Sequence, residues 1–324
     1  MPKVLVVGGA GYIGSICGRA LRDAGMATVT YDDLSTGHRA AVEDQLIEGD
    51  IRDQEKLVEV LNTGKFDAVM HFAARSLVGE SVTNPPLYYD VNVGGTASLV
   101  QAMSRTKCRA LVFSSTCAIY GNPQYLPLDE EHPKAPVSPY GDSKATVERM
   151  LEGAREQLGI HVTSLRYFNA AGATPDASLG EAHKHETHLI PLALAAAHGR
   201  RAELKLFGTD YPTRDGTCIR DYIHVLDLAQ AHKLALNALL DGSPGSHYNV
   251  GTGQGTTVRE VLASIERTTG LSVPHSAADR RPGDPPELYA QAEKIGRELG
   301  WSPKWTHIDD IVSTAAKWAS TPRF

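Results

Sequence analysis

A tyrosine and a lysine four residues apart are the pair in this sequence best suited to chemistry. Tyr140 and Lys144 lie in the stretch SPYGDSKATVERM, which reads as a helix. Residues four apart project from one helical face, so an ammonium on Lys144 would lie near the Tyr140 phenol. A positive neighbour lowers a phenol pKa from its usual value of about 10, which favours acid–base chemistry near neutral pH. On spacing alone, a solvated helix face is the commoner explanation.

A glycine-rich stretch near the N-terminus is the second chemical signal. In VLVVGGAGYIGSICGRAL, Gly8, Gly11 and Gly14 fit G-x-x-G-x-x-G, and Gly9 with the last two fits G-x-G-x-x-G. The pattern follows an apolar strand and opens a helical segment, which is the context that a dinucleotide-binding loop requires. Glycines let the backbone approach a pyrophosphate, and the helix N-terminus supplies free N–H groups. We therefore expect a dinucleotide to bind here.

Acidic residues follow two of the predicted strands. Asp32 and Asp33 end the second strand, at the distance expected for a carboxylate that binds the adenosine ribose. An acid at this position favours NAD over NADP, because it would repel a 2′-phosphate. Asp50 follows the third strand, where it either reaches the adenine amino group or caps the helix that starts near Asp53. The residues alone leave both roles of Asp50 open.

The elements that must position these residues alternate between strand and helix. Helical patterns lie near 12–24, 53–62, 89–105 and 140–158, and strands are predicted at Val4–Val7, Thr28–Tyr31, Gln45–Glu48, Ala68–Phe72, Ala110–Ser114 and Val162–Arg166. This alternation predicts an α/β fold with a Rossmann-like, doubly wound parallel sheet. Because parallel strands end at one edge of the sheet, the glycine loop, the acids and Thr116 should meet there.

The pattern of residue types changes in the second half of the chain. We expect residues 1–172 to form an NAD-binding domain and 173–324 a smaller, mixed α/β substrate domain, while the segment around 215–242 could pack back on the first. The stretch after Asn169 reads as a loop. Beyond it the patterns predict brief strands near 203–207 and 247–250, and helices near 188–198, 226–240, 257–269 and 306–319.

The overall composition narrows the class of partner. The chain has 324 residues, of which 42% are hydrophobic and 22% charged, and a net charge of −6 with both signs interspersed. This argues against a nucleic-acid or anionic-membrane partner. No apolar run approaches the ~20 residues needed to span a bilayer. The four cysteines lack metal spacing, and His183 and His185 show no ligand pattern, so we expect no metal and a reduced, cytoplasmic setting.

Several further stretches carry a family resemblance. The order and spacing of six features carry this resemblance: the glycine loop, YGDSK, SSTCAIYG, LRYFNAAGA, DGTCIRDYIHVLDLAQAH and RRPGD. In these features the chain resembles the UDP-glucose 4-epimerase family of extended short-chain dehydrogenases/reductases. The resemblance runs from about residue 3 to residue 315. It implies NAD as cofactor, and 4-epimerisation of UDP-glucose and UDP-galactose through a transient 4-keto sugar. It also implies a homodimer, paired through helices such as 89–105 and 140–158.

The same resemblance implies a role for individual residues. Tyr140 would be the acid–base, Lys144 its tuning partner, and Thr116 the group that orients the sugar hydroxyl. The cofactor would also contact Gly8, Gly11, Tyr12, Ile13, Gly14, Asp32, Asp33, Asp50, Ile51, Phe72, Ala73, Asn92 and Phe168. The substrate would also contact Tyr167, Asn169, His188, Leu189, Arg220, Arg281, Asp284 and Leu288.

Two substrate positions depart from other members of the family. His188 stands where others have an asparagine. Leu288 stands where members vary residue size to admit or exclude N-acetylated sugars, and its intermediate size leaves the tolerance for UDP-N-acetylglucosamine and UDP-N-acetylgalactosamine open.

Related activities make different demands on these positions. Nucleotide-sugar 4,6-dehydratases need an Asp–Glu pair after the strand-end hydroxyl, where this chain has Cys117 and Ala118. Decarboxylases and uronate epimerases need a cation for the sugar carboxylate, and no additional cation can be placed from the sequence. A non-catalytic NAD-binding sensor typically loses the tyrosine or the lysine, and both are present. The sequence therefore favours the epimerase.

Overall fold

A seven-stranded parallel sheet is the centre of the computed structural model, which describes residues 1–281 and 283–324. The strands run in the order β10-β6-β5-β4-β1-β2-β3, and every neighbouring pair is parallel. The predicted doubly wound α/β fold is confirmed. The strands are β1 (Lys3–Val7), β2 (Ala27–Asp32), β3 (Gln45–Glu48), β4 (Ala68–His71), β5 (Ala110–Ser114), β6 (His161–Tyr167) and β10 (His247–Val250).

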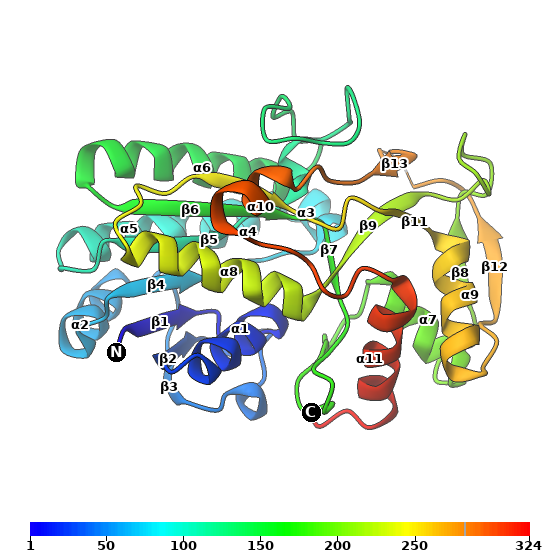
Figure 1. Cartoon of the computed structure of the whole chain (residues 1–324), viewed down its shortest axis with the longest axis horizontal. Coiled ribbons are helices and arrows are strands. Elements are labelled where there is room, and N and C mark those ends of the chain that lie inside the picture. The colour runs from blue at the N-terminus through cyan, green and yellow to red at the C-terminus, as the bar shows by residue number, and fades with distance from the viewer. Residues whose placement is uncertain (282) are drawn as a thin grey trace.

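Helices cover both faces of this sheet, because alternate strand residues point to opposite sides. Val4 and Val6 are fully buried in the core on one face, whereas Leu5 and Val7 are fully buried in the core on the other. The first core is closed by α1 (Tyr12–Asp23) and α8 (Val225–Leu240). The second is closed by α2 (Gln54–Gly64), α5 (Gly95–Ser104) and α6 (Pro139–Leu158), as Figure 1 shows.

The predicted helix near 89–105 is not uniform. Its first part, η2 (Tyr89–Gly94), is a π-helix, and α5 continues directly from it. Such π-helical turns occur frequently at functional sites. The short elements around it and after β2 and β5 are α3 (Val78–Thr83), α4 (Pro85–Tyr88), η1 (Arg39–Ala41) and η3 (Cys117–Ile119).

A smaller part, at the right of Figure 1, is built around β9 (Ile219–His224). This strand pairs with β7 (Asn169–Ala171), β11 (Gly255–Thr257) and β13 (Glu287–Leu288). The stretch after Asn169 therefore begins as a strand, which corrects the prediction of a loop from that residue. A separate pair joins β8 (Leu204–Phe207) to β12 (His275–Ala278), and helices α7 (Leu189–Ala197), α9 (Val258–Thr269) and α11 (Ile308–Ser320) enclose a third core.

The two halves of the chain interleave in space. Helix α8 packs against α1 and against β5 and β6, and β10 extends the large sheet beside β6. Helix α10 (Glu293–Leu299) contacts β10 and α8, so part of the chain well beyond 242 also joins the larger layer. The division at residue 172 stays a prediction. Among the described helices, none combines the length and the apolar character needed to cross a membrane.

Candidate active site

The glycine loop between β1 and α1 has space only for glycine at two positions. Gly8 has a φ of +82°, and a Cβ there would lie 2.3 Å from the Ala73 nitrogen. A Cβ on Gly14 would lie 2.2 Å from the Gly8 carbonyl oxygen. Gly11 is the N-cap of α1, and its added Cβ would meet nothing nearer than 3.5 Å, so this side of the loop is open. The backbone N–H groups at the helix start are thus available to an anion.

Asp32 braces this loop from the end of β2. Its carboxylate accepts a hydrogen bond from the Ala10 backbone N–H at 2.9 Å and another from Leu34 at 2.8 Å. Burial raises the pKa of Asp32, and the two N–H donors act against this. Each carboxylate oxygen has one of these donors and retains a second lone pair for a hydroxyl. The glycine cradle and this carboxylate together fit a dinucleotide. Asp33, the second predicted acid, is exposed.

The structure excludes one of the two roles considered for Asp50. The N-cap of α2 is Asp53, which accepts a hydrogen bond from the Lys56 backbone N–H at 3.0 Å. The capping role for Asp50 is therefore wrong. Asp50 instead accepts from the Arg52 backbone N–H at 2.8 Å, and hydrogen bonding from the Arg52 guanidinium lowers the pKa of Asp50. Ile51, beside it, is buried.

Other predicted cofactor residues surround the glycine loop. The backbone N–H groups of Phe72 and Ala73 both donate to the Val7 carbonyl, at 2.7 and 3.1 Å, which holds the end of β4 against the loop. The Tyr12 hydroxyl donates to the Gly172 carbonyl at 2.6 Å. Ile13 follows Tyr12 in the first turn of α1. These contacts gather residues from three distant stretches at one edge of the sheet.

Helix α6 carries Tyr140 and Lys144, and its start is fixed by a local capping arrangement. Ser138 accepts a hydrogen bond from the Gly141 backbone N–H at 3.2 Å, and a proline occupies the first helical position. The ring of Tyr140 lies edge-on to Tyr88, with centroids 6.4 Å apart. The Lys144 Nζ donates to the Ser114 carbonyl at 2.8 Å. The helix therefore delivers both side chains to the end of β5.

Thr116 lies at the same strand end. It is buried, and its hydroxyl accepts a hydrogen bond from the Ala118 backbone N–H at 3.2 Å. A hydrogen bond with Thr116 also acts to lower the pKa of Tyr140. The three residues predicted to handle the proton are thus brought together at the end of β5, Thr116 from the N-cap of η3 and the other two from α6.

The electrostatics of Tyr140 and Lys144 differ from the prediction made from spacing. Burial raises the pKa of Tyr140 to about 12, and the hydrogen bond with Thr116 offsets only part of this. Burial likewise lowers the pKa of Lys144 to about 7, although the Glu148 carboxylate acts to raise it. A buried site disfavours the charged form of both groups. Burial is therefore the largest influence on both pKa values, whereas the spacing predicted a lowered tyrosine pKa.

Asn92 positions the first turn of α6 from the π-helix η2. Its side chain donates to the Ser143 hydroxyl at 3.0 Å and accepts from the Arg75 backbone N–H at 2.8 Å. The Ser143 hydroxyl in turn donates to the Tyr140 carbonyl at 2.7 Å. Nearby, the hydroxyl of Tyr167 lies 2.5 Å from that of Ser114, at the ends of β6 and β5.

The predicted substrate residues come from β9, β13 and the adjoining loops. The Arg220 guanidinium pairs with the Asp284 carboxylate, and although burial acts to lower the Arg220 pKa, this partner raises it. Leu288 stands opposite Arg220 in the β9–β13 register and packs with a buried cluster that contains Cys117 and Phe168. These contacts place Leu288 beside the strand end that carries Thr116.

Two other predicted substrate residues, Asn169 and Arg281, contact different parts of the chain. The Asn169 amide donates to the Asp221 carbonyl at 3.0 Å and so ties β7 to β9. The Arg281 guanidinium is 4.1 Å from the centroid of the Phe207 ring, on β8. The structure thus joins Arg220 and Asp284 directly, whereas Arg281 stacks on a separate strand.

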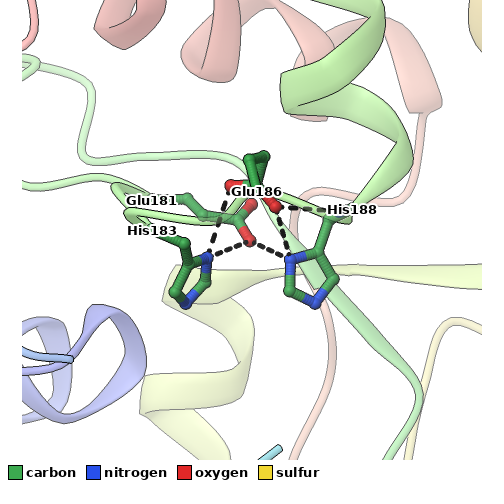
Figure 2. Close-up of side chains that lie close together, drawn as sticks. All are labelled: Glu181, His183, Glu186 and His188. Carbon is green, nitrogen blue, oxygen red and sulfur yellow. Dashed lines mark hydrogen bonds and ion pairs between the residues drawn. The ribbon is translucent and has the colours of Figure 1, made fainter. Parts of the chain in front are cut away.

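His188 belongs to a cluster that sequence reasoning missed (Figure 2). It is the N-cap residue of α7, just before Leu189, and its Nδ1 lies 2.7 Å from Glu181 and 2.8 Å from Glu186. His183 lies 3.3 Å from the same two carboxylates. Their spacing indicated no ligand set, but the structure brings His183 and His188 together with two carboxylates. The E-x-H-x-x-E-x-H spacing of residues 181–188 was the signal that could have revealed it.

The parallel sheet, the glycine cradle and the Tyr–Lys pair define a Rossmann-like protein of the short-chain dehydrogenase/reductase class. Residues 4–251 match the model of the NAD dependent epimerase/dehydratase family, and the chain belongs to this family. A UDP-glucose 4-epimerase of Azospirillum brasilense is 50% identical over 319 residues, which cover 98% of this chain and 92% of that relative.

Solved structures show the same likeness. The UDP-glucose 4-epimerase from Brucella ovis in complex with NAD is 48% identical, with a TM-score of 0.96 over 98% of this chain and 99% of that one. The UDP-glucose 4-epimerase from Stenotrophomonas maltophila, with bound NAD and formylated UDP-arabinopyranose, is 39% identical, with a TM-score of 0.95 over 99% and 98% of the two chains.

Proposed function

We propose that this chain is an NAD-dependent UDP-glucose 4-epimerase that interconverts UDP-glucose and UDP-galactose. The observation that carries the proposal is the convergence of Tyr140, Lys144 and Thr116 at the end of β5, on the edge of the sheet that also holds the glycine cradle. The near-complete coverage of both chains in the comparisons supports it.

The residues that would hold NAD follow from the cradle. The backbone at Gly8, Gly11 and Gly14 would accept the pyrophosphate, and Asp32 would accept ribose hydroxyls. When bound, NAD supplies a hydride acceptor that later returns the hydride, together with the positive charge of its oxidised ring. Asp33, Asp50, Ile51, Phe72, Ala73, Asn92 and Phe168 would complete the site with Tyr12 and Ile13.

Tyr140 would take the proton from the 4-hydroxyl as the C4–H bond breaks, and would return it after the keto sugar presents its other face. A phenol with a pKa near 12 is a poor base at neutral pH, so its charged form needs added positive charge nearby. The Lys144 ammonium, already at the end of β5, would supply part of it. Thr116 would orient the hydroxyl by hydrogen bonding.

The nucleotide end of the substrate would lie toward β9. Arg220 is suited to bind a diphosphate, and the Asp284 carboxylate holds its guanidinium in place until the substrate arrives. Arg281, stacked on Phe207, would approach the diphosphate from β8. Asn169, His188 and Leu189 would contact the nucleotide, and Tyr167 and Leu288 the sugar.

We further propose a homodimer in a cytoplasmic setting. Exposed apolar side chains at Val78, Val82 and Tyr89 lie on α3 and η2, next to α6, and would suit burial against a second copy. The four cysteines are buried and free, which agrees with a reducing compartment. Light scattering on the eluted protein tests the dimer, for which a mass near twice 34.9 kDa is expected.

An assay of the purified protein on four substrates tests the proposed reaction. UDP-glucose and UDP-galactose should interconvert without accumulation of NADH, because the hydride is returned in each cycle. Turnover of UDP-N-acetylglucosamine and UDP-N-acetylgalactosamine would define the range that Leu288 permits. Stoichiometric NADH release, or no turnover of either parent sugar, would overturn the proposal.

A further inference from the structure

Four side chains in the loop before α7 converge on a single point (Figure 2). Glu181, His183, Glu186 and His188 each offer one ligand atom, and these atoms all lie within 4.8 Å of one another. Two imidazole nitrogens and two carboxylate oxygens form a donor set suited to zinc. We infer that these four side chains bind one divalent transition-metal cation of the zinc class.

The distances within the cluster favour a shared cation. His183 Nδ1 lies 3.3 Å from Glu181 Oε1 and 3.3 Å from Glu186 Oε2, while His188 Nδ1 faces the same two carboxylates at 2.7 and 2.8 Å. A ring nitrogen carries at most one hydrogen, so neither histidine can donate fully to both acceptors. A cation at the centre contacts all four atoms at once.

Tetrahedral zinc geometry matches the distances from His183 to the two carboxylates, whereas the His188 distances would have to lengthen and the widest pairs of ligand atoms, up to 4.8 Å apart, would have to move closer. Ligand atoms about 2.0–2.1 Å from zinc lie about 3.4 Å from one another, close to the distances at His183. The His188 ring, whose side chain is 46% exposed, has room to withdraw by the roughly half an ångström that the same geometry requires.

The charge of the cluster also matches a divalent cation. Two carboxylates and two neutral imidazoles carry a formal charge of −2. A divalent cation neutralises this charge, and it binds the two imidazoles in their neutral form.

The ligands are oriented by further contacts. Glu186 Oε1 accepts hydrogen bonds from the Thr187 and His188 backbone N–H groups, at 2.7 and 2.8 Å, and this leaves Oε2 to face His183. The Glu181 backbone carbonyl accepts from the Trp318 indole at 2.8 Å, which ties it to α11. Such outer contacts typically fix the ligands of a metal site.

The location of the cluster indicates what the cation would do. His183 and the cofactor-loop residues Gly11 and Tyr12 line one small cavity, and His188 stands at the start of α7. Burial and the two nearby carboxylates raise the pKa of Tyr12, so their negative charge reaches the dinucleotide loop. A closed set of four protein ligands is typical of a structural site. The cation would fasten the loop to α7 and cancel negative charge beside the loop that cradles the pyrophosphate.

Zinc binding by the intact chain tests the inference. After EDTA treatment and its removal, equilibrium dialysis should show one Zn²⁺ per chain that depends on the cluster, and Co²⁺ in its place should give the intense visible absorption of tetrahedral coordination. His183→Gln should lower the affinity of this site at least about tenfold. His185→Gln is the matched control, because His185 is an exposed histidine of the same loop outside the cluster.

The result that overturns the inference is equally direct. If wild type, His183→Gln and His185→Gln bind the same amount of Zn²⁺ with the same affinity, the cluster is an ion-pair network only. Circular dichroism must show each variant folded, and Glu181→Gln, which keeps its backbone bond to Trp318, provides a second loss-of-site variant. The metal measurement needs no turnover, so its failure and a failure of the epimerase assay are distinguishable.

Discussion

Glu148 and Lys144 are buried charged residues on neighbouring turns of α6, and their partners differ. The Glu148 carboxylate accepts from Arg166 at 2.8 and 3.0 Å, from Lys134 at 2.8 Å and from the Ser115 hydroxyl at 2.6 Å. Lys144, one turn earlier, donates to the Ser114 carbonyl and forms no ion pair with any part of the chain that the structure describes. Both side chains are about 3% exposed.

The difference shows what partner charges do at equal burial. Burial acts to raise the Glu148 pKa, but the bonds and charge of Arg166 and Lys134 outweigh it and lower that pKa to about 2. At Lys144 burial prevails, and its pKa falls to about 7. The fold thus stabilises the charged form of Glu148, which has a structural role. The charge of Lys144, at the proposed catalytic site, is not stabilised in this way and changes near neutral pH.

The largest expected effect lies at the chemical end of this comparison. Tyr140→Phe should lower turnover of UDP-glucose about 10³-fold or more, because it removes the only group in the proposed mechanism that exchanges the proton. Steady-state kinetics measure the loss, and fluorescence titration should show NAD binding unchanged. Tyr125→Phe, at an exposed tyrosine outside the proposed dimer surface, is the control. A near-normal rate for Tyr140→Phe would exclude it as the acid–base.

At Glu148 we expect a loss of stability rather than a loss of turnover. Glu148→Gln should lower the free energy of unfolding by about 3–5 kcal/mol at pH 7, because it leaves the buried Arg166 without its carboxylate. The Glu148 pKa is about 2 in the folded state against an ordinary 4.5, so its contribution is present above about pH 4.5 and is lost as pH falls toward 2. The difference in free energy of unfolding between wild type and Glu148→Gln, measured by urea denaturation, should therefore become smaller as pH falls toward 2.

An exposed neighbour provides the control for this prediction. Glu152 lies 3.8 Å from the same Lys134, and its side chain is 53% exposed. Glu152→Gln should change the free energy of unfolding by no more than about 1 kcal/mol. Equal losses for the two variants would mean that burial of the pair does not decide its contribution.

The Lys144 charge should lower the stability of the fold, whereas the Glu148 charge raises it, and the effect at Lys144 should be smaller. Its folded-state pKa of about 7 is below the ordinary 10.5, so the folded protein binds fewer protons than the unfolded chain between these values, and stability rises with pH there. Lys144→Met should therefore be more stable than wild type at pH 6, by about 1–3 kcal/mol, with a smaller gap at pH 9. Lys107→Met, at an exposed lysine, should show no such trend in urea denaturation. A gap that does not change with pH would contradict the prediction.

The smallest effect concerns substrate choice at Leu288. Leu288→Tyr should lower any activity on UDP-N-acetylglucosamine about tenfold more than activity on UDP-glucose, because the larger ring would fill space beside the sugar. The ratio of kcat/KM values measures this. Leu271→Tyr, at an exposed leucine, is the control. Equal losses on both substrates would refute the role of Leu288 in selection.

Much of the fold and part of the site followed from local patterns. The six strands of the first half stand where their apolar runs predict, since such runs bounded by turn residues have few other ways to be buried. The smaller part was predicted less well. Strand β9 was missed because IRDYIH mixes charged with apolar residues, although Asp215 and Gly216 form a turn signal just before it. The Glu–His cluster was missed because its spacing fits no common ligand pattern.

The sequence by itself determined the glycine loop, the acid after the second strand and the Tyr–Lys spacing, since each depends on residues close together in the chain. Only the tertiary structure decided that Arg220 pairs with Asp284, and that Glu148 gains Arg166 while Lys144 gains no carboxylate among the described residues. The physical reason is that pKa values and ion pairs depend on burial and on through-space neighbours. Those are set when distant segments pack together.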